Sequence, residues 1–84
     1  MKKTYMVSNP TGIHARPARK IVEAAIKFPC EIFLEKDGSQ YNAKSLIKMM
    51  LISAKSGDEI TVIAEGEQSE SAIEAIGILL GSYH

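Results

Sequence analysis

Several functional classes need features that this sequence lacks. Its 84 residues include one cysteine, Cys30, so neither an intramolecular disulfide nor a cysteine metal cluster can form, and a reducing cytoplasm is the simplest setting. Ten basic and ten acidic side chains cancel, which removes the electrostatic argument for nucleic acid or an acidic membrane as a partner. No apolar run has the length of a signal peptide or of a membrane span. We therefore expect a cytoplasmic protein that neither crosses a membrane nor is exported by a signal peptide.

The side-chain groupings of a self-contained enzyme are missing as well. The sequence has no metal-ligand cluster, no paired catalytic carboxylates and no glycine-rich nucleotide loop, so we expect no enzyme, no cofactor and no metal ion. Linkers, internal repeats and low-complexity segments do not occur either. A chain of 84 residues has room for one domain, which we expect to span residues 1–84. We also expect it to be a monomer.

What the sequence does have is a histidine directly before a predicted helix. Pro17 has a fixed φ that suits the first helical turn and lacks the N–H that would be unpaired there. A helix should therefore begin within a residue of Pro17, which leaves His14 just upstream. The unpaired first-turn N–H groups and the helix dipole amount to about half a positive charge. Such a place favours a bound anion.

The neighbours of His14 suit the same chemistry. Arg16 adds a permanent cation, and Gly12 can take a positive φ that lets the loop turn sharply. The positive helix end disfavours protonation of the imidazole, and a neutral imidazole is a good nucleophile near neutral pH. A cation is misplaced at a helix N-terminus unless an anion binds there. We therefore expect His14 to be a nucleophile towards phosphoryl groups, although a lone loop histidine is more often merely solvated.

Periodicity outlines the other elements. Alternation and β-branched residues predict strands at residues 3–7, 31–35, around 41 and 60–64. Helical spacing predicts helices at residues 17–28, after residue 45 and after residue 66, the last with an apolar stripe that reaches residue 83. Asp37-Gly38 is typical of a short hairpin turn. The segment 46–52 is too apolar for an ordinary surface helix, so it is either deeply buried or in part a docking surface. This order of elements implies an α+β sandwich, one sheet with its helices on one side.

The motifs resemble those of a known family. The match in letters and spacing is to the active-site signature of HPr, the histidine phosphocarrier of the phosphoenolpyruvate-dependent sugar phosphotransferase system, in Gly12-Ile13-His14-Ala15-Arg16-Pro17-Ala18. Two further segments resemble the Gram-positive type, Asn42-Ala43-Lys44-Ser45 and the hairpin Leu34-Glu35-Lys36-Asp37-Gly38. The similarity covers nearly the whole chain without a gap. It implies an HPr-like open-faced β-sandwich, with four antiparallel strands in the order 1-4-2-3 and three helices on one side.

The resemblance also implies a function. His14 would accept a phosphoryl group on Nδ1 from phosphorylated enzyme I and pass it to a histidine of a sugar-specific enzyme IIA domain, with Arg16 beside the phosphate. Ser45 would be a regulatory phosphoserine, made by an HPr serine kinase and read by a transcriptional regulator. From the residues alone, Ser45 is simply an N-cap that stabilises its helix by about 1 kcal/mol. Both interpretations can hold.

The chain differs from the usual family pattern behind Ser45. Lys48 and Ser53 stand where the pattern has glycines, and Lys48 places a cation in an otherwise apolar contact patch. The first helix is also more basic than is usual, at Arg19 and Lys20. We expect the partner surface to consist of Arg19, Lys20, Ile47, Lys48, Met50 and Leu51.

Two other functional classes stay open. One is an HPr-like regulatory protein that acts through Ser45 and protein contacts, although the presence of His14 argues against it because such paralogues can lack the histidine. The other is an unrelated small-molecule-binding α+β domain in which the motif is a coincidence. Failure to gain acid-labile phosphate would point to the latter.

Overall fold

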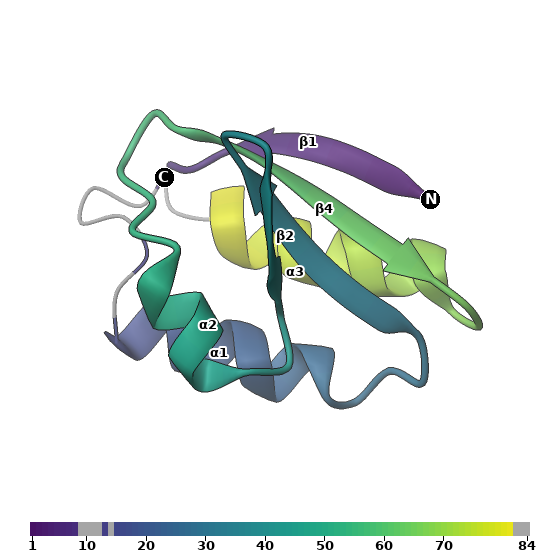
Figure 1. Ribbon diagram of the computed structural model, residues 1–84. Coiled ribbons are helices and arrows are strands. Elements are labelled where there is room, and N and C mark those ends of the chain that lie inside the picture. The colour runs from purple at the N-terminus through teal and green to yellow at the C-terminus, as the bar shows by residue number, and fades with distance from the viewer. Residues whose placement is uncertain (9–12, 14, 82–84) are drawn as a thin grey trace.

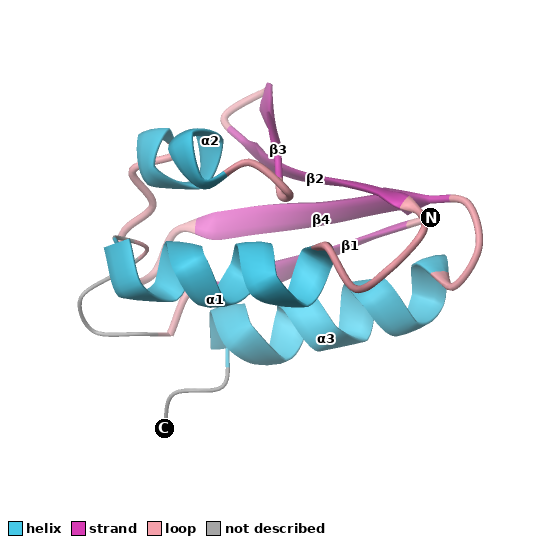
Figure 2. Ribbon diagram, turned by 90° about the horizontal axis from the view of Figure 1, so that it is seen from below, coloured by secondary structure: helices cyan, strands magenta, loops and turns pink. Residues whose placement is uncertain are grey.

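The seven elements alternate between a single sheet and the helices that cover one side of it. The computed structural model describes residues 1–8, 13 and 15–81. Its elements are β1 (Lys2–Met6), α1 (Ala15–Ala25), β2 (Glu31–Lys36), β3 (Ser39–Asn42), α2 (Leu46–Leu51), β4 (Glu59–Glu65) and α3 (Ser69–Gly81). All three strand pairs are antiparallel and the strand order is β1-β4-β2-β3, with α1 and α3 side by side beneath the sheet (Figures 1 and 2). The predicted α+β open-faced sandwich and its strand order are confirmed.

The sheet is buried on its helix-facing side and open on the other. In β2, Ile32 and Leu34 are buried while the residues between them are not, and β4 alternates in the same way. The helices contribute the opposite wall of the core. The buried apolar side chains of the strands and helices are those of Ile32, Leu34, Ile60, Val62, Ala64, Ala18, Ile21, Ala25, Met49, Ala72, Ile73, Ile76 and Leu80. Each large apolar side chain buried in this way stabilises the fold by about 1.5–3 kcal/mol.

The boundaries of α1 differ slightly from the prediction. The helix begins at Ala15, two residues before Pro17, so the predicted start is one residue late. Proline is tolerated at this position because N–H groups of the first turn have no intrahelical partner. The helix ends at Ala25, and a further turn with a 3.2 Å hydrogen bond from Phe28 N to Ala25 O leads to the predicted stop before Pro29. At the other end of the chain, the predicted stripe position Tyr83 lies outside the described residues.

The hairpin between β2 and β3 has the predicted two-residue turn. Asp37 and Gly38 both have positive φ, +52° and +83°, and the flanking Lys36 and Ser39 are paired in the ladder. Two consecutive positive φ values define the type I′ turn, whose twist matches that of antiparallel strands. The dipeptide therefore sets the register of this hairpin.

Tyr5 of β1 lies directly on Gly77 of α3. The Tyr5 hydroxyl donates a hydrogen bond to Ile73 O at 3.5 Å, and a Cβ atom added to Gly77 would overlap the tyrosine ring. A glycine in a helix interior costs about 1 kcal/mol relative to alanine. Here the absence of a side chain at Gly77 allows β1 and α3 to approach closely.

Cys30 is buried where the chain enters β2, with 2 % of its surface exposed. It lies against Gly66, in the turn between β4 and α3. Gly66 has a φ of +120°, and a Cβ there would lie 3.3 Å from Cys30 Cα and Cβ. The backbone conformation and the close approach therefore both favour glycine at this position.

The helices are short. Within residues 1–8, 13 and 15–81, none of them combines the length and the apolar character needed to cross a lipid bilayer.

Candidate phosphoryl-transfer site

His14 lies outside the described residues, so its surroundings are defined by the segments on either side of it. On the upstream side, Val7 is buried and makes two backbone hydrogen bonds to the loop before β4. Val7 N donates to Asp58 O at 2.9 Å, and Gly57 N donates to Val7 O at 2.8 Å. The chain that leads into the histidine segment is thus tied to residues 57 and 58.

Further along the chain, Ile13 is the residue directly before the histidine. It is buried, and its N–H donates to Ala54 O at 2.9 Å. The residue after the histidine, Ala15, is the first residue of α1. His14 therefore comes directly before the first-turn N–H groups, as the sequence predicts.

The first turn of α1 is basic and has no acidic residue. Arg16, Arg19 and Lys20 are all exposed, and none of them forms an ion pair with any residue that the structure describes. Their positive charges are available to an anion or to an acidic partner.

Ser45 is the N-cap of α2, as the sequence predicts. Its backbone is extended (φ −108°, ψ 116°) and its Oγ accepts a hydrogen bond from Lys48 N at 3.3 Å. Asn42 holds the preceding turn, because its Oδ1 accepts from Lys44 N at 2.9 Å. The Lys44 ammonium donates to Phe28 O at 2.7 Å and so links this turn to the end of α1.

The apolar helix α2 is both a core element and an exposed surface. Met49 is fully buried on α2. In contrast, four apolar residues are exposed by 40–70 %, and we call them the α2 apolar patch: Leu46, Ile47, Met50 and Leu51. Lys48 is exposed as well. All six residues of the predicted partner surface therefore lie exposed on α1 and α2, two helices in contact with each other.

Sequence reasoning predicted a loop at residues 55–58 but missed that it holds the segment before the histidine. We call residues 53–58 the 53–58 loop; its backbone bonds to Val7 and to Ile13, both of which precede His14 in the chain. The one signal for it in the sequence is Ser53, where the HPr pattern has glycine, and Ser53 has a φ of +51°.

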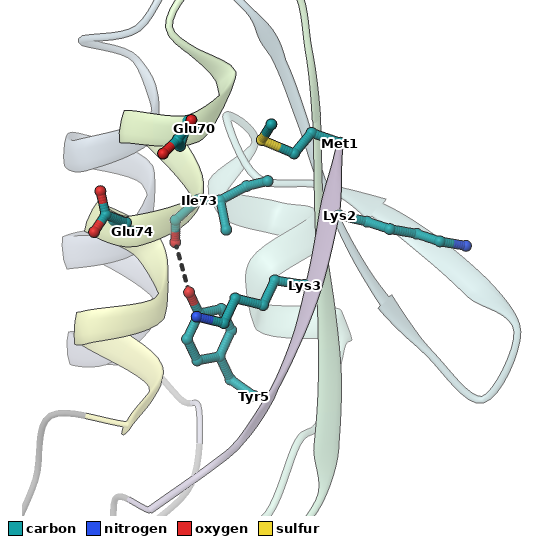
Figure 3. Close-up of a pocket in the computed structure, with 7 residues that line it drawn as sticks. All are labelled: Met1, Lys2, Lys3, Tyr5, Glu70, Ile73 and Glu74. Carbon is teal, nitrogen blue, oxygen red and sulfur yellow. Dashed lines mark hydrogen bonds between the residues drawn. The ribbon is translucent and has the colours of Figure 1, made fainter.

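A separate pocket of about 270 Å³ lies between β1 and α3. Figure 3 shows Tyr5 pointing from β1 towards α3, with Lys3 over its ring and Glu70 and Glu74 on the facing helix. The Lys3 Nζ lies 5.4 Å from the centroid of the Tyr5 ring. None of the residues that line this pocket belongs to the predicted site, so we do not assign it to the phosphoryl-transfer site.

The chain is similar to known proteins over most of its length. The chain matches the family model described as "PTS HPr component phosphorylation site" over residues 1–82. It is 43 % identical to the HPr-like protein Crh of Halalkalibacterium halodurans over 90 % of both chains. It is 42 % identical to the phosphocarrier protein HPr of Treponema pallidum, over 88 % of this chain and 84 % of that protein. The structure of HPr from Bacillus anthracis superposes with a TM-score of 0.91 at 39 % identity, over 95 % of each chain.

The expectation of a monomer is contradicted by solved relatives. Bacillus subtilis Crh was solved as a domain-swapped dimer (TM-score 0.80, 38 % identity, 90 % of this chain and 87 % of that chain). HPr of Thermoanaerobacter tengcongensis was also solved as a dimer (TM-score 0.76, 41 % identity, 90 % and 87 %). A swapped dimer keeps the contacts of the monomer and exchanges which chain supplies an element. The monomer prediction is therefore wrong. The sequence could not have shown this, because the hydrophobic pattern of a swapped dimer is the same as that of the monomer.

Proposed function

The chain belongs to the HPr family of the phosphoenolpyruvate-dependent sugar phosphotransferase system, and on that premise we propose that it is a cytoplasmic phosphocarrier formed by one HPr domain, residues 1–84. His14 accepts a phosphoryl group from phosphorylated enzyme I and passes it to a sugar-specific enzyme IIA domain. The observation that supports this role is the start of α1 at Ala15, which puts unpaired N–H groups directly after His14.

The chemistry follows from that arrangement. The neutral Nδ1 of His14 attacks phosphorus, and the bond between phosphorus and the donor group of phosphorylated enzyme I breaks. The same exchange then runs towards the enzyme IIA histidine, so the carrier ends each cycle unchanged. The N–H groups at the start of α1 and the Arg16 guanidinium stabilise the charge on the phosphoryl oxygens. Partner enzymes supply the donor and the acceptor, and the carrier is not itself a catalyst.

The direct test is incubation with phosphoenolpyruvate and enzyme I. We expect one acid-labile phosphoryl group per chain, detected by mass and by phosphorus NMR as a phosphohistidine. A chain that stays unlabelled beside a labelled Gram-positive HPr control would contradict the proposal.

The similarity to Crh favours a second candidate, an HPr-like regulator that acts through Ser45. In support of it, Ser45 caps α2 directly beside the α2 apolar patch, where a phosphate would change the charge of the exposed surface. Parallel incubations, one with enzyme I and phosphoenolpyruvate and one with an HPr serine kinase and ATP, distinguish the two roles. A regulator is labelled on Ser45 and not on His14, whereas a phosphocarrier is labelled on His14 by enzyme I.

Replacing Arg16 with alanine should slow phosphoryl transfer through His14 by roughly ten- to a hundredfold, because charge-assisted hydrogen bonds to a phosphate are worth about 1.5–3 kcal/mol. Arg16→Glu should be slower still, since its carboxylate repels the phosphoryl oxygens. Rapid-quench transfer rates measure the effect, and thermal unfolding should change little because Arg16 is exposed. Lys27→Ala, an exposed change in the turn that follows α1, is the matched control. Unchanged rates in both Arg16 variants would mean that the helix N–H groups suffice.

The substitutions Lys48→Gly and Ser45→Asp should change the affinity for a partner in opposite directions. An apolar partner groove on the α2 apolar patch would desolvate the exposed Lys48 ammonium, so Lys48→Gly should bind a Gram-positive enzyme I roughly tenfold more tightly. Ser45→Asp adds a negative charge beside the patch and should weaken binding. Calorimetric titration measures both, with Lys48→Ala as the control that keeps helix propensity. Equal or weaker binding of both Lys48 variants would show that Lys48 faces an acidic site on its partner.

A further inference from the structure

Lys36, the last residue of β2, connects the two ends of the 53–58 loop. Its Nζ lies 3.4 Å from Ser53 O and 3.6 Å from Asp58 Oδ2, with Asp37 Oδ2 at 3.8 Å. The Lys36 side chain is only 21 % exposed, so its ammonium is partly shielded from water. One cation therefore contacts the first and the last residue of the loop.

Ser53, the first residue of the loop, has an unfavourable backbone conformation. Ser53 has a φ of +51°, a left-handed conformation that costs a residue with a Cβ roughly 1–2 kcal/mol. Such a conformation persists only where the surroundings hold it. Two hydrogen bonds do so here, from Lys36 Nζ to the Ser53 carbonyl and from Ser53 Oγ to Leu51 O at 3.3 Å.

The last residue of the loop is held from both sides. Asp58 Oδ2 accepts a hydrogen bond from Lys55 N at 2.8 Å in addition to its ion pair with Lys36. The carbonyl of the same residue accepts from Val7 N, upstream of His14. A shift of the Asp58 backbone would therefore also move Val7, through the hydrogen bond between them.

Both ends of the 53–58 loop are bonded to the chain segment that precedes the histidine. The Ser53 end of the loop precedes Ala54, whose carbonyl binds Ile13 N, and the Asp58 end binds Val7. We propose that Lys36 is a positioning residue for His14: it holds the 53–58 loop, whose backbone fixes Val7 and Ile13, the described residues that precede the histidine. This inference rests on the proposed function. Lys36 acts through the loop backbone and not by contact with the phosphoryl group.

Three lysine variants test the inference. Lys36→Met keeps the aliphatic length and removes the charge and the donors, while Lys36→Arg keeps both. Lys2→Met, an exposed change in β1 with the same loss of charge, is the matched control. In case Lys36→Met does not fold, Asp58→Asn removes the same ion pair from its other side.

The first measurement is native-state amide exchange by NMR, which needs no enzyme I. In Lys36→Met, Ile13 and Val7 should exchange at least about tenfold faster, while Leu34 and Val62 in the centre of the sheet stay unchanged. Lys36→Arg should restore the protection and Lys2→Met should not alter it. Unchanged exchange at Ile13, or equally faster exchange in the centre of the sheet, would overturn the inference.

The second measurement is the phosphoryl-transfer rate with the protein as the substrate of enzyme I. We expect kcat to fall about three- to tenfold in Lys36→Met with KM unchanged, because a misplaced nucleophile slows the chemical step and leaves partner binding intact. Lys36→Arg should regain most of the rate. A change in KM alone would make Lys36 a partner contact and overturn the positioning role. If even the unaltered protein is not labelled, the proposed function fails, and amide exchange still decides whether Lys36 holds the loop.

Discussion

His14→Ala is expected to lose all phosphoryl labelling by enzyme I and phosphoenolpyruvate. The substitution removes the nucleophilic nitrogen, and the remaining N–H groups and Arg16 have no electrons to donate to phosphorus. The effect should therefore be complete, unlike the partial loss expected for Arg16. Stability should change by no more than about 0.5 kcal/mol, because His14 is not among the apolar positions that the sequence assigns to the core.

The chain offers a matched control for this experiment. Its one other histidine is His84, so His84→Ala should be labelled as fast as the unaltered protein. Mass measurement of the intact protein, before and after mild acid, separates phosphohistidine from phosphoserine. Normal labelling of His14→Ala, or loss of labelling in His84→Ala, would contradict the assignment of His14.

The second large effect is expected at Gly77. On helix propensity alone, alanine at this position should stabilise α3 by about 1 kcal/mol. The new methyl group would, however, meet the Tyr5 ring and force it away from α3, breaking its hydrogen bond to Ile73 O. Overpacking of this kind costs about 1–3 kcal/mol and the lost hydrogen bond about 1 kcal/mol more, so the net change is a loss of about 1–3 kcal/mol and the sign is reversed. We expect Gly77→Ala to unfold about 5–20 °C lower than the unaltered protein.

Two variants make this expectation specific. Gly81→Ala lies in the same helix, but its Cβ would be at an ordinary 3.7 Å from Met6 O, so it should be neutral or slightly stabilising. Tyr5→Leu should make room for the methyl group and cost less in the Gly77→Ala background than alone. Calorimetric unfolding of the four proteins completes the double-mutant cycle. Additive changes would show that Tyr5 and Gly77 are not in contact.

Local patterns were enough to predict the elements of the fold. Alternating burial in β2 and the dipeptide Asp37-Gly38 are properties of neighbouring residues, and both appear in the structure as predicted. Local patterns could not predict the strand order, because the order depends on pairings between segments that are distant in the sequence. It came from the resemblance to HPr and not from periodicity.

The candidate site shows the same division. His14 and Arg16 were chosen from their position before Pro17, and Ser45 from its place before an apolar run. Lys36 could not be found in this way, because its partner Asp58 is distant in sequence and nothing local indicates the contact. Nor could the pattern decide which residues of α2 are buried. That depends on how α2 sits against α1 and β3, which only the three-dimensional structure reveals.

The burial of Cys30 gives the protein a built-in probe of its own opening reactions. A buried thiol is alkylated only while the structure around it is open, so its labelling rate follows the open fraction when reclosing is fast. The chain has no other cysteine to compete for the reagent and no tryptophan to follow by fluorescence. Thiol trapping at this one position can therefore compare variants without denaturant, in the same buffer in which phosphoryl exchange is measured.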